Sequence, residues 1–123
     1  MILKNFDLKK EKIEKFKFFL LYGNNKGLIE EVINNKLKPM LSKNVYSYEE
    51  DEILKNLDNF LEDLLNKSFF ENDKLIIISR TTDKIVKLIE NLINKNIDNI
   101  SFILIANILE KKSKIRNFFE KNK

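Results

Sequence analysis

The chain has 123 residues, a net charge of +4 and a hydrophobic fraction of 43%, which allows one domain with a hydrophobic core. It contains no cysteine, histidine or tryptophan, and this excludes disulfides, thiolate metal sites and histidine-dependent catalysis. No apolar run approaches the ~20 residues of a membrane span, and the N-terminus lacks a signal-peptide core. We therefore predict a single cytoplasmic domain over residues 1–123, with no metal, no cofactor and no membrane contact.

Two segments carry opposite charge. Residues 47–63 contain seven acids against Lys55, a balance of −6, whereas residues 108–123 contain six basic residues against two acids, a balance of +4. This separation argues against a simple nucleic-acid-binding protein, in which basic residues would gather on one face throughout. We interpret both segments as solvated helix faces. The alternative for the second segment is a DNA-binding patch formed by Lys111, Lys112, Lys114 and Arg116.

The first elements follow from the apolar pattern. Residues 9–17 predict a short charged helix, and the continuous apolar run 18–22, stopped by Gly23, predicts a strand covered on both faces. A stripe of helical period begins at Leu28 and predicts a helix that Pro39 stops. The apolar members of that stripe are Leu28, Ile29, Val32, Ile33 and Leu37.

A second strand and a long helix come next. Val45 and Tyr46 predict a short strand, and Ser47 followed three residues later by Glu50 forms a capping-box pattern, so we expect a helix to begin at Tyr48. The acids at 49–52 would then lie in the first turn, where the helix dipole stabilises negative charge. Its buried face is predicted to contain Ile53, Leu54, Leu57, Phe60, Leu61, Leu64 and Leu65.

The second half of the chain repeats the pattern. Residues 75–78 and 102–106 predict buried strands, and the apolar stripe over 85–93 predicts a helix between them. Alternating strands and helices are typical of a parallel α/β sheet. Residues 111–119 predict a final amphipathic helix with a basic exposed face.

The segment Gly23-Asn24-Asn25-Lys26-Gly27 lies where a phosphate loop occurs, between a strand and a helix. Its glycines are one residue too close for a nucleotide-hydrolysing loop, and Leu28 and Ile29 replace the required lysine and hydroxyl. The strand at 75–78 leads into Ser79-Arg80-Thr81-Thr82, without the carboxylates that bind magnesium. Both absences argue against ATP hydrolysis. An anion nest that binds a nucleotide or phosphate without hydrolysis remains an alternative.

The order of these pieces resembles the N-terminal domain of the delta subunit of the bacterial DNA polymerase III clamp loader, over nearly the whole chain. The resemblance implies a three-layer α/β domain, with a mainly parallel five-stranded sheet of the P-loop or AAA+-like type and a degenerate nucleotide site. It also implies that the chain is a fragment of a longer subunit. The matching stretches are residues 19–23 with the helix after them, 68–70, 74–79, 102–106 and 109–114.

The resemblance further implies a domain that is not itself an enzyme. It would grip the ring-shaped sliding clamp and favour its open form, with other clamp-loader subunits as partners of the full-length protein and DNA contacted only indirectly. The family's gripping element is an apolar pair in the loop before the third core strand, which corresponds here to Phe69 and Phe70, with Ser68 beside them. The family usually has leucine at the first position, so Phe69 adds bulk. Composition alone favours the alternative that both rings cap the core.

Overall fold

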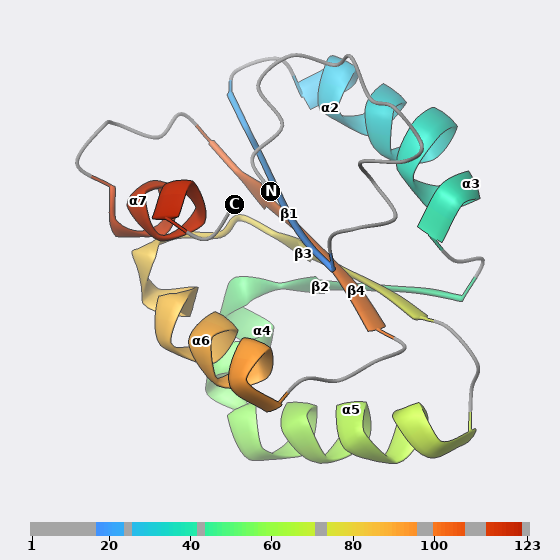
Figure 1. The fold of residues 1–123 in the computed structure, drawn as a ribbon, viewed down its shortest axis with the longest axis vertical. Helices are drawn as coiled ribbons and strands as arrows, with labels where there is room; N and C mark the ends of the chain where they lie inside the picture. Colours follow the sequence, from blue (N-terminus) through green and yellow to red (C-terminus); the bar gives the residue numbers. More distant parts are fainter. Residues whose placement is uncertain are drawn as a thin grey trace.

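Four strands form one parallel sheet, in the order β1-β4-β3-β2 (Figure 1). The computed structural model describes residues 17–23, 26–41, 44–70, 74–95, 100–107 and 113–121. The strands are β1 (Phe18–Tyr22), β2 (Val45–Glu49), β3 (Lys74–Ser79) and β4 (Ile100–Ala106). The mixed α/β class and the parallel sheet are confirmed. The prediction of five strands is wrong for the described residues, which contain three continuous apolar runs and the less buried edge strand β2.

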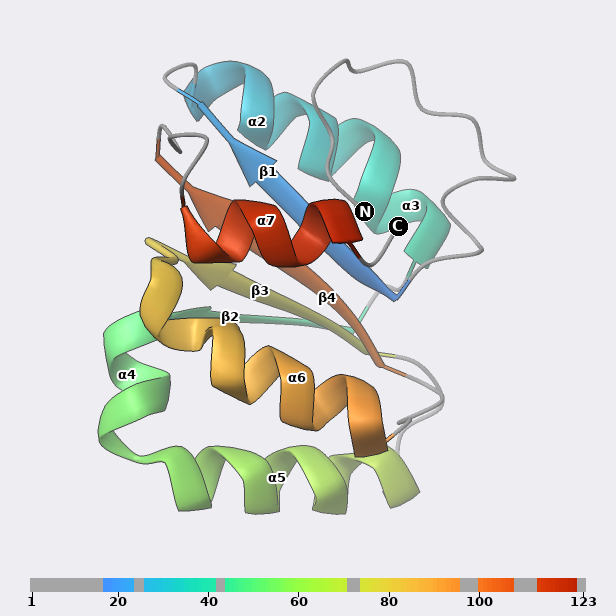
Figure 2. The same ribbon diagram turned by 60° about the vertical axis from the view of Figure 1, so that its left-hand side comes forward.

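Helices cover both faces of the sheet, so the domain has three layers (Figure 2). One face is covered by α2 (Lys26–Val32), the π-helical segment η1 (Ile33–Leu37) and α3 (Lys38–Leu41). The opposite face is covered by α4 (Glu50–Lys55), α5 (Leu57–Phe70), the short 3-10 turn η2 (Asp83–Ile85), α6 (Val86–Lys95) and α7 (Lys114–Lys121). None of the described helices has the length and apolarity needed to cross a bilayer.

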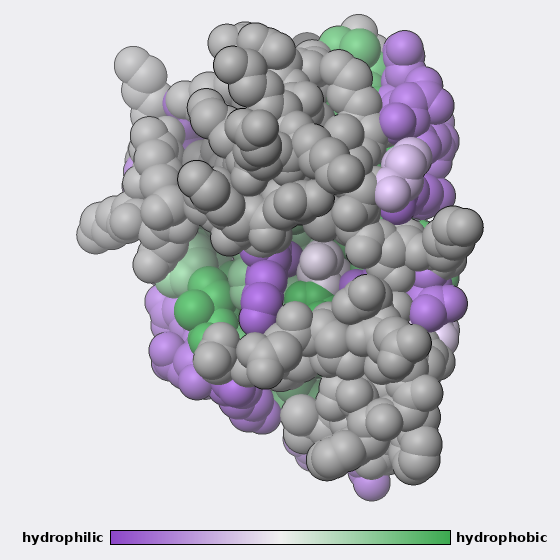
Figure 3. All heavy atoms as spheres, turned by 45° about the vertical axis from the view of Figure 1, so that its right-hand side comes forward, coloured by the Kyte–Doolittle hydropathy of each residue, from purple (hydrophilic) through white to green (hydrophobic). Residues whose placement is uncertain are grey.

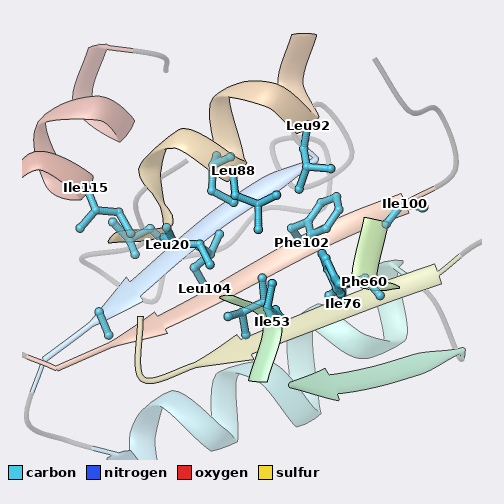
Figure 4. Close-up of a cluster of buried hydrophobic side chains, with 14 of the residues drawn as sticks. Leu20, Ile53, Phe60, Ile76, Leu88, Leu92, Ile100, Phe102, Leu104 and Ile115 are labelled. Atoms are coloured by element: carbon cyan, nitrogen blue, oxygen red, sulfur yellow. The ribbon is translucent and has the colours of Figure 1, made fainter. Parts of the chain in front are cut away.

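Strand side chains alternate between two hydrophobic clusters. Leu20 of β1 lies in the cluster beneath α4 to α7, whereas its neighbours Phe19 and Leu21 lie in the cluster beneath α2 and η1. Both neighbours and Leu20 itself are fully buried, which explains why this strand is apolar without interruption. Figure 4 shows the larger cluster, in which Phe102 and Leu104 of β4 lie among side chains from α4, α5, η2, α6 and α7. The Phe102 ring also stacks on Phe18, with centroids 4.8 Å apart.

The helix that was predicted to stop at Pro39 continues past it. The chain passes through a π-helical segment, in which the Lys38 amide bonds to the carbonyl of Ile33, and continues as α3 over the proline. A proline lacks an amide hydrogen and crowds the carbonyl four residues before it. The wider π-helical turn immediately before Pro39 shifts the hydrogen-bond register there, and this lets the helix continue.

The helix predicted from Tyr48 begins later and is broken. Ser47 and Tyr48 belong to β2, so the predicted capping box is wrong. Helix α4 begins at Glu50, and the side chain of its N-cap residue Glu49 forms no capping hydrogen bond. Pairing with β3 across Ser47 and Ile77 keeps these residues extended. A turn at Asn56, with φ −132° and ψ 52°, then separates α4 from α5. Residues 9–16 of the helix predicted at 9–17, and residues 111 and 112 of the helix predicted at 111–119, lie outside the described residues.

Candidate functional site

The predicted phosphate loop begins with a glycine that the backbone requires. Gly23 directly follows β1 and has φ +136°, a region that residues with a side chain rarely adopt. Helix α2 begins at Lys26, and Gly27 is its exposed second residue. The predicted strand–glycine–helix context is therefore present. Asn24, Asn25 and the side chain of Lys26 lie outside the described part.

The carboxyl end of β3 faces this junction without an acidic pair. Arg80, in a left-handed conformation with φ 55°, and Thr81 follow the strand. Thr81 is buried, and both its amide and its hydroxyl donate to the carbonyl of Ile105, at 3.0 and 2.5 Å. Hydrogen bonds from Thr81 therefore connect the end of β3 to β4. Arg80 lies 3.8 Å from the exposed Glu49 carboxylate, a surface pair that contributes little.

A small cavity of about 170 Å³ lies at the carboxyl ends of β3 and β4. This edge is where open α/β sheets bind ligands, but pockets for small molecules span roughly 300–1,000 Å³. The cavity is thus small for a nucleotide, and the Glu30 carboxylate on its wall would repel phosphate. Among the described residues, no group of acids could hold a metal ion. The lining residues are Ile29, Glu30, Ser79, Arg80, Ile105, Ala106 and Asn107.

Two carboxylates hold the loop after β3, and the sequence interpretation missed both. Glu50, expected on a solvated face, is buried and accepts hydrogen bonds from the amide and hydroxyl of Thr82. Asp83 accepts hydrogen bonds from the Ser113 hydroxyl at 2.9 Å and the Ile115 amide at 3.0 Å, at the start of α7. The backbone hydrogen bond from Ile115, the largest influence, holds the pKa of Asp83 below its ordinary value. The Thr-Thr-Asp run before a helical segment is the signal that could have located this junction.

The predicted clamp-binding residues lie in the last turn of α5. Ser68, Phe69 and Phe70 are helical, and β3 begins at Lys74, so the pair ends a helix and does not belong to a loop as predicted. The reason is that residues 57–70 contain no glycine or proline to end the helix earlier. The side chains at 65–70 lie outside the described part.

Few large hydrophobic side chains are exposed among the described residues. Ile93 of α6, with 38% of its surface exposed, is the one large hydrophobic side chain classed as exposed among the described residues. In Figure 3, the hydrophobic patches of described residues are small and interrupted by hydrophilic ones on the face shown.

Helix α5 is anchored to the sheet at its other end. Phe60 and Leu64 are buried beneath it, and the Phe60 ring meets Tyr48 of β2 edge to face, with centroids 5.3 Å apart. Lys74 of β3 is also buried, with Nζ 5.9 Å from the centre of the Tyr46 ring. The contacts of Phe60 and Leu64 hold this part of α5 on the sheet.

Comparison with known proteins identifies one family. The family model described as DNA polymerase III, delta subunit, matches residues 19–123 of this chain. No curated protein and no solved structure gives a significant match. The family match confirms the resemblance seen in the sequence.

Proposed function

Because the chain belongs to the DNA polymerase III delta subunit family, we propose that it is a clamp-loader domain that hydrolyses no nucleotide, binds the DNA polymerase sliding clamp and helps to open it for loading onto DNA. The family match over residues 19–123 is the observation that carries this proposal. The partners are the clamp and the other loader subunits. The chain contacts DNA only indirectly, through these partners, and acts in the cytoplasm.

The lack of hydrolysis follows from the two sides of the degenerate site. Buried Ile29 and partly buried Leu28 occupy the first turns of α2, where a nucleotide-hydrolysing loop has a lysine and a hydroxyl. At the end of β3, Arg80 and Thr81 stand in place of magnesium-binding acids, and Thr81 is engaged with Ile105. We infer that the domain is an AAA+-like scaffold whose nucleotide site has been lost.

The clamp contact is assigned to Phe69 and Phe70, with Ser68 beside them. Aromatic side chains supply large contact areas, and a few such anchors carry most of the energy of a typical interface. A position in the last turn of α5 adds a physical advantage, because α5 is held on the sheet through Phe60 and Leu64. An anchor on a fixed helix loses less conformational entropy on binding than one on a mobile loop.

The proposal is tested by calorimetric titration of the chain with the sliding clamp of the same organism. Combining Phe69→Ala with Phe70→Ala should weaken binding by about 2 kcal/mol or more, roughly 30-fold. Ile93→Ala, which truncates the exposed residue on α6, is the matched control and should leave affinity unchanged.

Two further measurements make the result decisive. Circular dichroism identifies variants that remain folded, and only these are compared. Phe69→Leu restores the family's usual residue and should bind within about threefold of the unmodified chain, since it keeps an apolar anchor. A folded double variant that binds the clamp as tightly as the unmodified chain would overturn the assignment.

A further inference from the structure

Helices α4 and α5 meet in a fixed corner at Asn56. The Asn56 amide donates to the carbonyl of Ile53 at 3.3 Å, and the Asn56 carbonyl accepts from the amide of Phe60 at 2.9 Å. These bonds close the last turn of one helix and open the first turn of the next. The corner is therefore a defined part of the fold, visible where α4 turns into α5 in Figure 2.

This corner encloses an open pocket of about 380 Å³, which we call the elbow pocket. Its apolar floor is formed by Tyr48, Ile53 and Phe60, and its rim carries Glu52, Lys55 and Asp63. Ile53 and Phe60 belong to the hydrophobic core, and Tyr48 packs edge to face on Phe60. The floor is thus rigid, and the volume suits one or two long side chains.

The rim of the elbow pocket has a net negative charge, because Glu52 and Asp63 face the single basic residue Lys55. Glu52 and Asp63 are both exposed, and neither forms an ion pair within the described part of the chain. The surrounding helix surface adds the exposed acids Asp51, Asp58 and Glu62. Lys55 is the single basic residue between 47 and 63. This face is therefore strongly acidic in a chain whose net charge is +4.

We propose that the elbow pocket binds a basic segment of a partner protein, through a lysine or arginine side chain of that segment. The methylene stem of such a side chain packs on an aromatic floor, and its cationic head reaches carboxylates at the rim. An arginine fits this arrangement best, because its planar head stacks on aromatic rings and pairs with carboxylates at once. The site uses the first half of α5 and no residue of 68–70, so it does not rest on the proposed clamp contact.

The test is an NMR titration of the 15N-labelled chain with a synthetic peptide of alternating leucine and arginine, compared with the same sequence carrying glutamine in place of arginine. We expect the arginine peptide to shift the amides of residues 48, 52–56 and 59–63 saturably. Combining Glu52→Gln with Asp63→Asn should weaken this binding roughly fivefold, since it removes two partly exposed ion pairs.

The matched control combines Asp58→Asn with Glu62→Gln, which removes the same charge from α5 outside the pocket. It should change the affinity by less than about twofold, because charges outside the pocket act only at longer range. Equal weakening in both double variants, or amide shifts spread over the whole acidic face, would mean that the attraction is non-specific and would overturn the proposal.

Other occupants have distinct outcomes. Elbow amides that shift with protein concentration alone indicate a second copy of this chain, and elbow amides that shift on addition of the sliding clamp indicate the clamp; either result overturns the proposed basic partner. Clamp affinity should be unchanged by the Glu52→Gln and Asp63→Asn pair. That measurement separates failure of this site from failure of the contact through Phe69 and Phe70.

Discussion

Both carboxylate oxygens of Glu50 accept a hydrogen bond from Thr82: Oε1 from the backbone amide at 2.9 Å and Oε2 from the hydroxyl at 2.8 Å. Glu50 is only 3% exposed although it lies at the exposed start of α4. The pair joins the helix after β2 to the loop after β3. Together with Thr81 and Asp83, it holds the loop at the carboxyl end of β3 in place.

Glu50→Ala should destabilise the domain by about 1–3 kcal/mol, because it leaves the amide and hydroxyl of Thr82 without their acceptor. The measurement is urea unfolding followed by circular dichroism. Asp51→Ala, at the exposed neighbouring position, is the control and should change the free energy of unfolding by less than about 0.5 kcal/mol. Equal effects of the two substitutions would contradict a specific role for the Glu50–Thr82 pair.

Asp83 predicts a pH dependence of stability. Because the backbone hydrogen bond from Ile115 at the start of α7 holds the pKa of Asp83 below its ordinary value, the ionised carboxylate stabilises the folded state above that ordinary pKa. The contribution is lost as the pH falls through the folded-state pKa. Asp83→Asn should therefore reduce the loss of unfolding free energy between neutral and strongly acidic pH. The effect is small because Asp83 is exposed and solvent screens it.

Denaturant unfolding at neutral and at acidic pH checks this prediction. Asp58→Asn, at an exposed position of α5, removes the same charge elsewhere and should leave the pH dependence as it is in the unmodified chain. If Asp83→Asn and Asp58→Asn behave alike, the hydrogen bonds from Ser113 and Ile115 do not stabilise the fold.

The two glycines should respond in opposite directions to substitution by alanine. Gly23→Ala forces a side chain into φ +136° and should destabilise the domain by about 1–2 kcal/mol, although a Cβ there would meet nothing within 4 Å. Gly27 is exposed in α2, so Gly27→Ala should stabilise by roughly 0.5 kcal/mol. Thermal unfolding distinguishes the two. A neutral Gly23→Ala would show that the turn adopts another conformation in solution.

Titration calorimetry with ATP and with ADP should show no binding at micromolar concentrations. The reason is the small cavity at the carboxyl ends of β3 and β4, together with the Glu30 carboxylate on its wall. Micromolar binding of either nucleotide would instead support the anion-nest alternative for residues 23–27 and would contradict a lost nucleotide site.

Three of the four strands could be predicted as continuous apolar runs because they are largely buried on both faces. The edge strand β2 has no buried residue, and only its first two residues were predicted. The run predicted at 18–22 is β1 itself, and those at 75–78 and 102–106 fall within β3 and β4. Continuous apolar runs of this length have few other stable environments in a small domain. The fifth strand, which only the family resemblance implied, is not found among the described residues.

The helix ends were less predictable, because tertiary contacts decide them. Pairing of Ser47 with Ile77 extends β2 through residues that form a good local helix start. At Pro39, a π-helical segment replaces the expected stop. The burial of Glu50 could not be predicted locally, since its partner Thr82 lies 32 residues away.

The pairing of β1 with β4 has a consequence for how the protein is made. Phe18 is aligned with Phe102, so the first strand of the described fold gains its neighbour only after most of the chain has been synthesised. At about 5–20 residues per second, this delay is on the order of 10 seconds. During that time β1 has no strand to pair with, and its apolar residues are not yet buried in the sheet. Folding on the ribosome should therefore begin with the contiguous β2, β3 and β4, and binding of a chaperone to nascent chains should be strongest before β4 emerges.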